Sequence, residues 1–241
     1  MSRADGRSPG DLRAPKIQLG VVSDCAGSAS VEQGKSHVVC CVRGPVQLTS
    51  EYRGAKGKVS VTVSISPFAL KTRRDSKSMS SVSLEKALGY VMEGICEQVV
   101  VLESFPQLCF ELSAVVILSE AQGRGGDKGE ADVLAADIGA LSTAVCAALT
   151  AAGVELKDVF TGVSMATLQQ ANANNCQQVV DPTGDELSSA TSVSSFVVGT
   201  STSAVYYSLQ EGCLPIEIIA ASLDSAVEAC KSQREAICKQ L

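Results

Sequence analysis

The stretch VVDPTGDEL gathers three carboxylates, Asp181, Asp185 and Glu186, around a proline and a glycine. Closely spaced carboxylates can hold a metal ion or supply the proton that a leaving group needs. Pro182 and Gly184 are also the residues that tight turns favour, and a turn would point Asp185 and Glu186 to solvent. The stretch alone therefore leaves open an acid site and a plain turn between strands.

A second set of residues could bind an anion. Lys71, Arg73 and Arg74 lie together in LKTRRDSK, which reads as a loop in an otherwise acidic chain. Such a loop could hold an RNA backbone by charge, or it could be a solvated loop in which Asp75 reduces the repulsion. Arg43, at a predicted strand end before a Gly-Pro pair, is a second RNA-binding candidate.

Other chemistries have little support in the sequence. His37 is the single histidine, it lies inside a predicted strand, and no CxxC pair is present, so we expect neither a zinc site nor a nucleophilic triad. The glycine-rich GRGGDKGE lacks the lysine pattern of a phosphate loop and is interpreted as a connection between a strand and a helix. We therefore expect no metal and no cofactor, and buried free thiols among the ten cysteines.

The composition is that of a globular chain. It has 241 residues, of which 45% are hydrophobic and 19% charged, with a formal net charge of −6. That charge argues against nucleic-acid binding through the protein as a whole, because phosphate contacts need clustered cations. The N-terminal residues lack the apolar core of a signal peptide, and the longest weakly polar run, 138–153, is shorter than the roughly 20 residues of a spanning helix. We expect a soluble intracellular chain without a membrane partner.

Hydrophobic periodicity predicts alternating groups of strands and helices. Strands are expected at 38–42, 58–66, 107–120, 159–168, 192–199 and 203–212, and helices within 81–100, at 131–152 and from Pro215 onward. Ser83 is the predicted N-cap of the first helix, and Gly153 the stop of the second. This order lacks a regular βαβ alternation, which favours α+β layers.

Several short words of the sequence, taken in order, carry a family resemblance. They are RADGR at 3–7, DLR at 11–13, GSASVEQGKSHVVCCVRGP at 27–45, SPFA at 66–69, AAGVELKDVFTGVS at 151–164 and DPT at 181–183. Together they resemble the RNase PH family of phosphorolytic 3′ to 5′ exoribonucleases and ring subunits of the RNA exosome. The resemblance covers nearly the whole chain. It implies an α+β fold of the RNase PH type, related to the ribosomal protein S5 domain 2-like fold, with mixed sheets packed with helices. It further implies one domain over 1–241, with 1–15 as an extended N-terminal arm.

The resemblance also indicates which site residues to look for. Active members hold the attacking phosphate with an arginine at the start of the alanine-rich helix, a position that falls on or beside Ile138, after Asp137. No arginine lies between Ala131 and Gly153. Active members also carry two aspartates six residues apart. The first corresponds to Asp181, but the second position is Leu187.

We therefore expect a chain that is not an enzyme, with Asp181 as the remnant of a catalytic site. The words DPT, VRGP and SPFA are similar to those of inert exosome ring subunits. Such a subunit would support 3′ to 5′ RNA processing and degradation and help line the RNA channel. Its partners would be other RNase PH-like ring subunits, RNA-binding cap proteins and RNA, in the nucleus, nucleolus and cytoplasm. Two alternatives stay open: an active phosphorolytic exoribonuclease, alone or with groups from a partner subunit, and a small-molecule enzyme unrelated to RNA.

Overall fold

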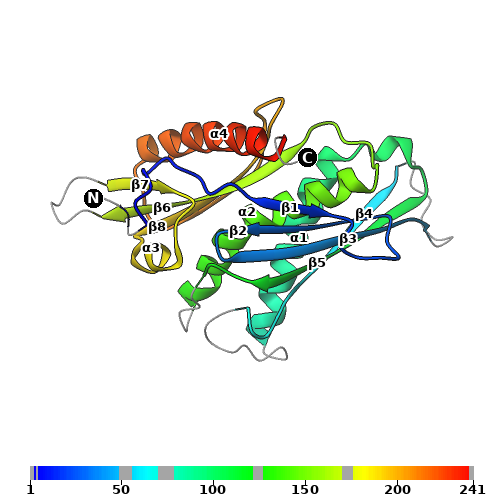
Figure 1. Cartoon of the computed structure of the whole chain (residues 1–241), viewed down its shortest axis with the longest axis horizontal. Coiled ribbons are helices and arrows are strands. Elements are labelled where there is room, and N and C mark those ends of the chain that lie inside the picture. The colour runs from blue at the N-terminus through cyan, green and yellow to red at the C-terminus, as the bar shows by residue number, and fades with distance from the viewer. Residues whose placement is uncertain are drawn as a thin grey trace.

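The computed structural model describes residues 3, 5–48, 56–69, 79–121, 127–169 and 176–238, with side chains throughout except at 79–81, 127–135, 169 and 176. Its elements run in the order β1 (Lys16–Leu19), β2 (Gly27–Gln33), β3 (Ser36–Gln47), β4 (Lys58–Ile65), α1 (Met79–Val99), the 3-10 turn η1 (Leu102–Ser104), β5 (Leu108–Leu118), α2 (Asp127–Ala151), β6 (Phe160–Gln169), β7 (Cys176–Val180), α3 (Gly184–Ser189), β8 (Ser192–Gly199), β9 (Val205–Glu211) and α4 (Ile216–Cys238) (Figure 1).

The first sheet has five strands in the order β1-β2-β3-β5-β4. All neighbours are antiparallel except β4 and β5, which are parallel because α1 lies between them in the chain. The predicted alternation in β4 is confirmed, since Val59, Val61, Val63 and Ile65 are buried against α1 while the residues between them face outward. This alternation fixes the register of the strand on the helix.

The second sheet has four antiparallel strands in the order β7-β6-β8-β9. Helix α4 packs on it from one side, and α2 contacts β6 and β8 while also contacting β2 and β3 of the first sheet (Figure 1). All eight residues of β8 are buried, as expected for a strand covered on both faces. The small residues of α2 allow a close approach: a Cβ on Gly162 of β6 would lie 3.0 Å from the Cα of Gly139.

Three sequence predictions about local structure can be compared with the fold. Gly153 has a φ of +69° just after α2, which confirms the predicted stop. Ser83 is not an N-cap, because α1 begins earlier, at Met79. The stretch after Asp181 is more than the predicted turn: Thr183 and Glu186 form a reciprocal capping box that starts the short helix α3.

The fold is thus the α+β fold that the sequence predicted, in which two sheets, the first of them mixed, are packed with helices. Among the helices of the described residues, none combines the length and apolar character needed to cross a bilayer.

Candidate functional site

Asp181 follows β7 with an unusual backbone conformation. Its φ is +50°, and its amide donates a hydrogen bond of 2.9 Å to the carbonyl of Ser164 on β6. The left-handed region is uncommon for residues other than glycine, although aspartate and asparagine tolerate it. Such conformations concentrate at functional sites, where the surrounding structure holds them.

The N-terminal segment brings two arginines to the Asp181 carboxylate. Arg13 binds it through two nitrogens of its guanidinium, with Nη2 2.7 Å from Oδ1 and Nε 2.6 Å from Oδ2. The amide of Arg13 donates to Oδ2 at 3.0 Å, and Nη1 of Arg7 adds a contact of 3.2 Å. Paired donors of this kind form the strongest hydrogen bonds that carboxylates accept. The segment before β1 therefore crosses the edge of the second sheet to reach Asp181 (Figure 1).

Glu120, just beyond β5, is the other carboxylate that Arg13 contacts. Nη1 of Arg13 lies 3.0 Å from Oε2 of Glu120, which also accepts the amide of Lys35 at 2.9 Å. The other oxygen accepts the amide of Gly184 at 3.0 Å, and Glu120 is buried. Burial alone lowers the pKa of Arg13, but its hydrogen bonds and proximity to the two carboxylates raise the pKa above its usual value. Arg13 thus joins the ends of the two sheets.

Glu186 contradicts its predicted position in solvent. Its carboxylate binds the buried guanidinium of Arg3, at 2.9 Å from Nε and 2.8 Å from Nη2, and Arg3 also donates to the carbonyls of Val180 and Asp181. Burial raises the pKa of Glu186, but hydrogen bonds from Arg3 and Thr183 outweigh it and leave the pKa below its usual value. The prediction failed because Arg3, 183 residues earlier in the chain, supplies the partner. Asp185 is exposed, as predicted.

The positions where active relatives carry an arginine and a second aspartate are both in the core. Ile138 is fully buried and Leu187 is 4% exposed, so neither position points a polar group at Asp181. Asp137 is fully buried as well. Its Oδ1 accepts hydrogen bonds from Ser119 at 2.9 Å and Ser36 at 3.4 Å, while Oδ2 has no partner among the described residues. Burial raises the pKa of Asp137 to about 7.

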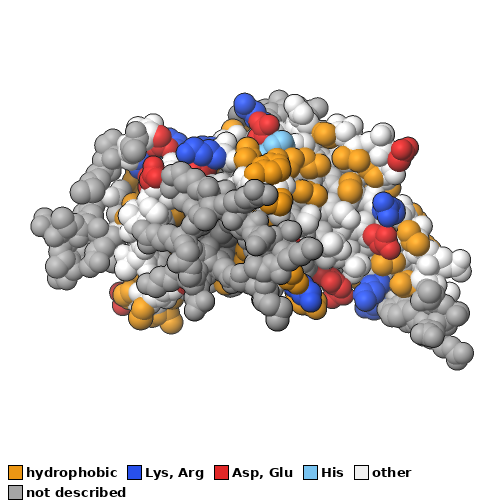
Figure 2. Space-filling model, turned by 90° about the horizontal axis from the view of Figure 1, so that it is seen from below, with side chains coloured by type: hydrophobic (Ala, Val, Ile, Leu, Met, Phe, Trp, Pro, Cys, Tyr) orange, Lys and Arg blue, Asp and Glu red, His pale blue; other side chains and the backbone are white. Residues whose placement is uncertain are grey.

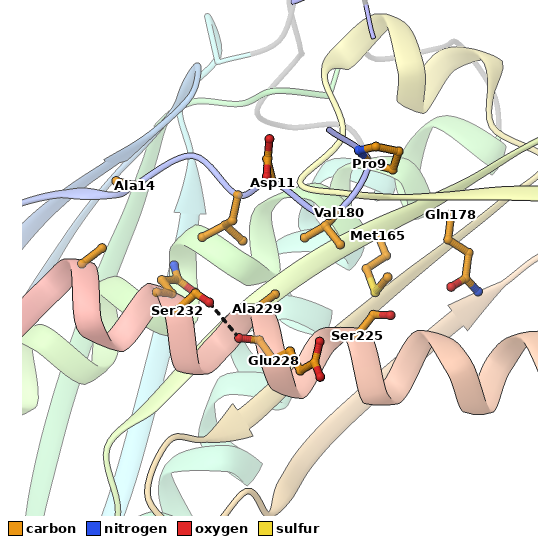
Figure 3. A pocket seen from close by; sticks show the side chains of 14 residues that line it. Pro9, Asp11, Ala14, Met165, Gln178, Val180, Ser225, Glu228, Ala229 and Ser232 are labelled. Atoms are coloured by element: carbon orange, nitrogen blue, oxygen red, sulfur yellow. Dashed lines mark hydrogen bonds between the residues drawn. The ribbon is translucent and has the colours of Figure 1, made fainter. Parts of the chain in front are cut away.

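A narrow cavity lies beside the side chains of Arg13, Glu120 and Asp181. It is lined by Arg13, Gln33, Ser36, Glu120, Ala136, Gly139, Ala140, Ser164, Asp181, Pro182 and Leu187. Its volume of about 10 Å³ has room for one water molecule. No group of three or more potential metal-binding side chains occurs within the described parts of the chain. A larger hollow of about 500 Å³ lies on the opposite side of the N-terminal segment, between that segment and α4 (Figure 3).

Arg43, the predicted RNA-binding residue that lies within the described part of the chain, does not join this network. Arg43 is on the surface, with 77% of its side chain exposed, and lies 3.9 Å from Glu111, whose side chain is 51% exposed. Lys71, Arg73 and Arg74 lie outside the described residues, so their role stays a prediction. His37 lies in β3, where its Nε2 is 2.8 Å from the Ser30 hydroxyl. Glu120 and the roles of Arg3, Arg7 and Arg13 were not predicted from the sequence, although the segments RADGR and DLR, which contain these arginines, were among those that carry the resemblance.

The comparisons with known proteins show that this fold is of the RNase PH type, as the resemblance implied. The RNase PH model, described as 3′ exoribonuclease family, domain 1, matches residues 11–155. The chain therefore belongs to this 3′ exoribonuclease family.

Individual proteins similar to this chain are found among both known sequences and solved structures. The exosome complex component Rrp41 of Pyrobaculum aerophilum is 29% identical over 165 residues, and that of Pyrobaculum arsenaticum is 30% identical over 165 residues. In both cases the match covers 68% of this chain and 61% of the relative. Rice Rrp46 superposes with a TM-score of 0.73 at 20% identity, covering 92% of each chain. A chain of the Archaeoglobus fulgidus exosome with RNA bound to the active site gives a TM-score of 0.74 at 18% identity, covering 98% of this chain and 92% of the other.

These findings correct one sequence prediction. We expected a chain that is not an enzyme, and that expectation is wrong: the chain belongs to an exoribonuclease family, and its curated relatives are Rrp41 components rather than inert subunits. The prediction inferred loss of activity from two positions, Ile138 and Leu187. Both residues lie in the core, where they replace the arginine and the aspartate of active relatives. The polar network around Asp181 is formed by residues of other segments, so these two positions alone do not determine what the site can do.

Proposed function

We propose that the chain is an RNase PH-like subunit of an RNA exosome ring and takes part in phosphorolytic 3′ to 5′ degradation of RNA. The observation that carries the proposal is the Asp181 carboxylate of this member of the 3′ exoribonuclease family. Arg13 and Arg7 bind the carboxylate, and the backbone of Asp181 is in the left-handed region. The relatives that match are named exosome components, which supports a place in such a complex.

The proposed reaction is the attack of inorganic phosphate on the last phosphodiester of an RNA chain. A phosphate oxygen bonds to the phosphorus of that linkage while the bond from phosphorus to the 3′ oxygen of the preceding nucleotide breaks. The 3′ oxygen takes up a proton, and a nucleoside 5′-diphosphate leaves. Two anions come together in this step, so the site needs cations around the transferring group.

We infer that these cations come partly from a neighbouring subunit. The guanidinium of Arg13 is bound to Asp181 and Glu120, and that of Arg7 to Asp5 and Asp181. Arg3 is buried on Glu186 and two backbone carbonyls. The helix α2 offers no arginine to replace them, because none occurs between Ala131 and Gly153. A site with its acid network in one chain and its phosphate cations in the next accounts for both observations.

The remaining parts of the proposal concern partners and location. Other RNase PH-like subunits would be the ring neighbours, with RNA-binding cap proteins on the ring and RNA in its channel, in the nucleus, nucleolus and cytoplasm. The words DPT, VRGP and SPFA resemble the ring subunit known as the messenger-RNA transport regulator, which supports a ring position of that kind. The basic residues Lys71, Arg73 and Arg74 would contact RNA in the channel.

An assay of phosphorolysis tests the proposal. RNA with a free 3′ hydroxyl is incubated with phosphate and magnesium, either with the chain alone or with the ring neighbour that co-purifies with it. We expect phosphate-dependent release of nucleoside diphosphates from the pair, and little from the isolated chain. Failure of every co-purified ring neighbour to support release would reject the proposal.

A further inference from the structure

A second groove lies beside the Asp181 network, at the edge of the first sheet. It is formed by the hairpin between β2 and β3, the turn after β4 and the end of β5. Its volume of about 520 Å³ lies within the range of small-ligand sites. Ser36 and Glu120 line both this groove and the narrow cavity that borders Asp181, so the groove opens next to the proposed reaction site.

An exposed aromatic side chain stands on one wall of the groove. Phe68 is 66% exposed, which is unusual for so large an apolar side chain. Its turn is held at both ends by backbone hydrogen bonds, from Ser66 to the carbonyl of Val116 and from Ser119 to the carbonyl of Ala69, at 2.9 and 3.1 Å. Phe68 therefore projects from a turn that is fixed to β5.

The opposite wall carries positive charge on a similarly fixed backbone. Lys35 is exposed and lies beside Gly34, whose φ of +61° makes the hairpin tight, and its amide is bound to Glu120. Its ammonium group makes no ion pair with any described residue. Two carboxylates line the groove, those of Glu32 and Glu120. Arg13 neutralises Glu120, so the exposed Glu32 is the one that reduces the positive charge of Lys35. His37, the single histidine of the chain, also lines the groove, and Figure 2 shows hydrophobic side chains around the histidine.

An aromatic face with a lysine across a groove is a combination that suits single-stranded RNA. Every base can stack on an aromatic ring, and the phosphate beside it needs a cation. We infer that this groove binds a nucleotide near the 3′ end of the RNA substrate, with its base on Phe68 and its phosphate on Lys35. The inference rests on the proposed function, since it gives that site a subsite for its substrate.

Equilibrium binding tests the subsite without any turnover. A 5′-labelled single-stranded RNA is titrated, in phosphate-free buffer, with the complex of the full chain and its co-purified ring neighbour. Phe68→Ala should weaken binding about tenfold, the scale of one lost base stack, while Phe68→Tyr keeps wild-type affinity. Tyr90→Ala is the matched control, because Tyr90 is an aromatic residue of α1 that is 73% exposed outside this groove.

Two further measurements identify the contacts. Lys35→Gln should lower the slope of log affinity against log salt by about 0.7, the value for one phosphate contact on a single strand. RNA with 5-iodouridine at its 3′ end should form a photocrosslink that maps to Phe68. An affinity of Phe68→Ala equal to that of Tyr90→Ala would overturn the inference. So would loss of the ring neighbour from Phe68→Ala preparations, which would show that Phe68 faces a protein instead.

The outcomes separate this inference from the proposed function. A complex that loses RNA affinity with Phe68→Ala, yet never releases nucleoside diphosphates, supports the subsite and rejects phosphorolysis. A complex that releases them while Phe68→Ala binds RNA like wild type rejects the subsite alone.

Discussion

The guanidinium of Arg13 lies between two carboxylates that belong to different sheets. Its Nε is 2.6 Å from Asp181 at the end of β7, and its Nη1 is 3.0 Å from Glu120 beyond the end of β5. Both carboxylates are buried. The contact therefore holds the two halves of the fold together at the site where we place the chemistry.

Replacing Arg13 should destabilise the protein strongly. Arg13→Met removes the cation and leaves two carboxylates in the interior, a change that costs about 3 kcal/mol of unfolding free energy in comparable buried pairs. Urea denaturation followed by circular dichroism measures the change. Lys56→Ala is the control, because its ion pair with Glu103 is on the surface, and it should leave the midpoint unchanged. Equal midpoints for the two variants would show that Arg13 does not stabilise the junction.

Asp137 should make stability depend on pH. Burial raises the pKa of Asp137 from its ordinary value of 3.8 to about 7. At a pH between these two values, Asp137 therefore keeps its proton in the folded protein and loses it in the unfolded chain. Between about pH 4 and 7 the folded state thus binds more protons, and its stability falls as pH rises. Asp137→Asn has no such proton. We expect the urea midpoint of the wild type, measured relative to this variant, to fall from pH 4.5 to 7.5. A constant difference between the two proteins would contradict the burial of a protonated Asp137.

Two glycine substitutions should have opposite effects. A Cβ on Gly27 in β2 would overlap the backbone nitrogen of Ala152 and lie 2.6 Å from the carbonyl oxygen of Ala148, at the end of α2. Gly27→Ala should therefore cost about 1 to 3 kcal/mol, as overpacked cores do. Gly94 in α1 has no neighbour within 4 Å of such a Cβ, so Gly94→Ala should stabilise the helix by up to about 1 kcal/mol. The melting temperatures of both variants test this packing. A Gly27→Ala variant as stable as the wild type would show that α2 does not pack closely on β2.

Local patterns in the sequence were sufficient to predict much of the fold. The alternation from Val59 to Ile65 and the glycine stop at Gly153 depend on neighbouring residues, and both are confirmed. The start of α1 could not be placed from Ser83, because the helix continues four residues before it. In general, periodicity locates an element better than it locates its ends.

The site was harder to predict because its partners are distant in sequence. Arg13 and Asp181 are 168 residues apart, and Arg13 and Glu120 are 107 apart. Family spacing pointed to Asp181, but comparing only the positions of Ile138 and Leu187 with active relatives led to the wrong prediction that the chain is not an enzyme. The arginines of the N-terminal words carried the missing information, since three guanidinium groups near the start of a chain with few buried charges need carboxylates to bind.

The central claim is that Asp181 serves phosphorolysis, and one variant tests it most directly. Asp181→Asn keeps a residue that tolerates the left-handed backbone but removes the charge. Phosphate-dependent release of nucleoside diphosphates is measured for the chain with its co-purified ring neighbour, and circular dichroism confirms that the variant folds. Asp185→Asn, an exposed neighbour, is the control. We predict release by the wild type and the control, and a loss of about 100-fold or more for Asp181→Asn. Wild-type activity in Asp181→Asn, or no phosphate-dependent release by the wild type, would contradict the account.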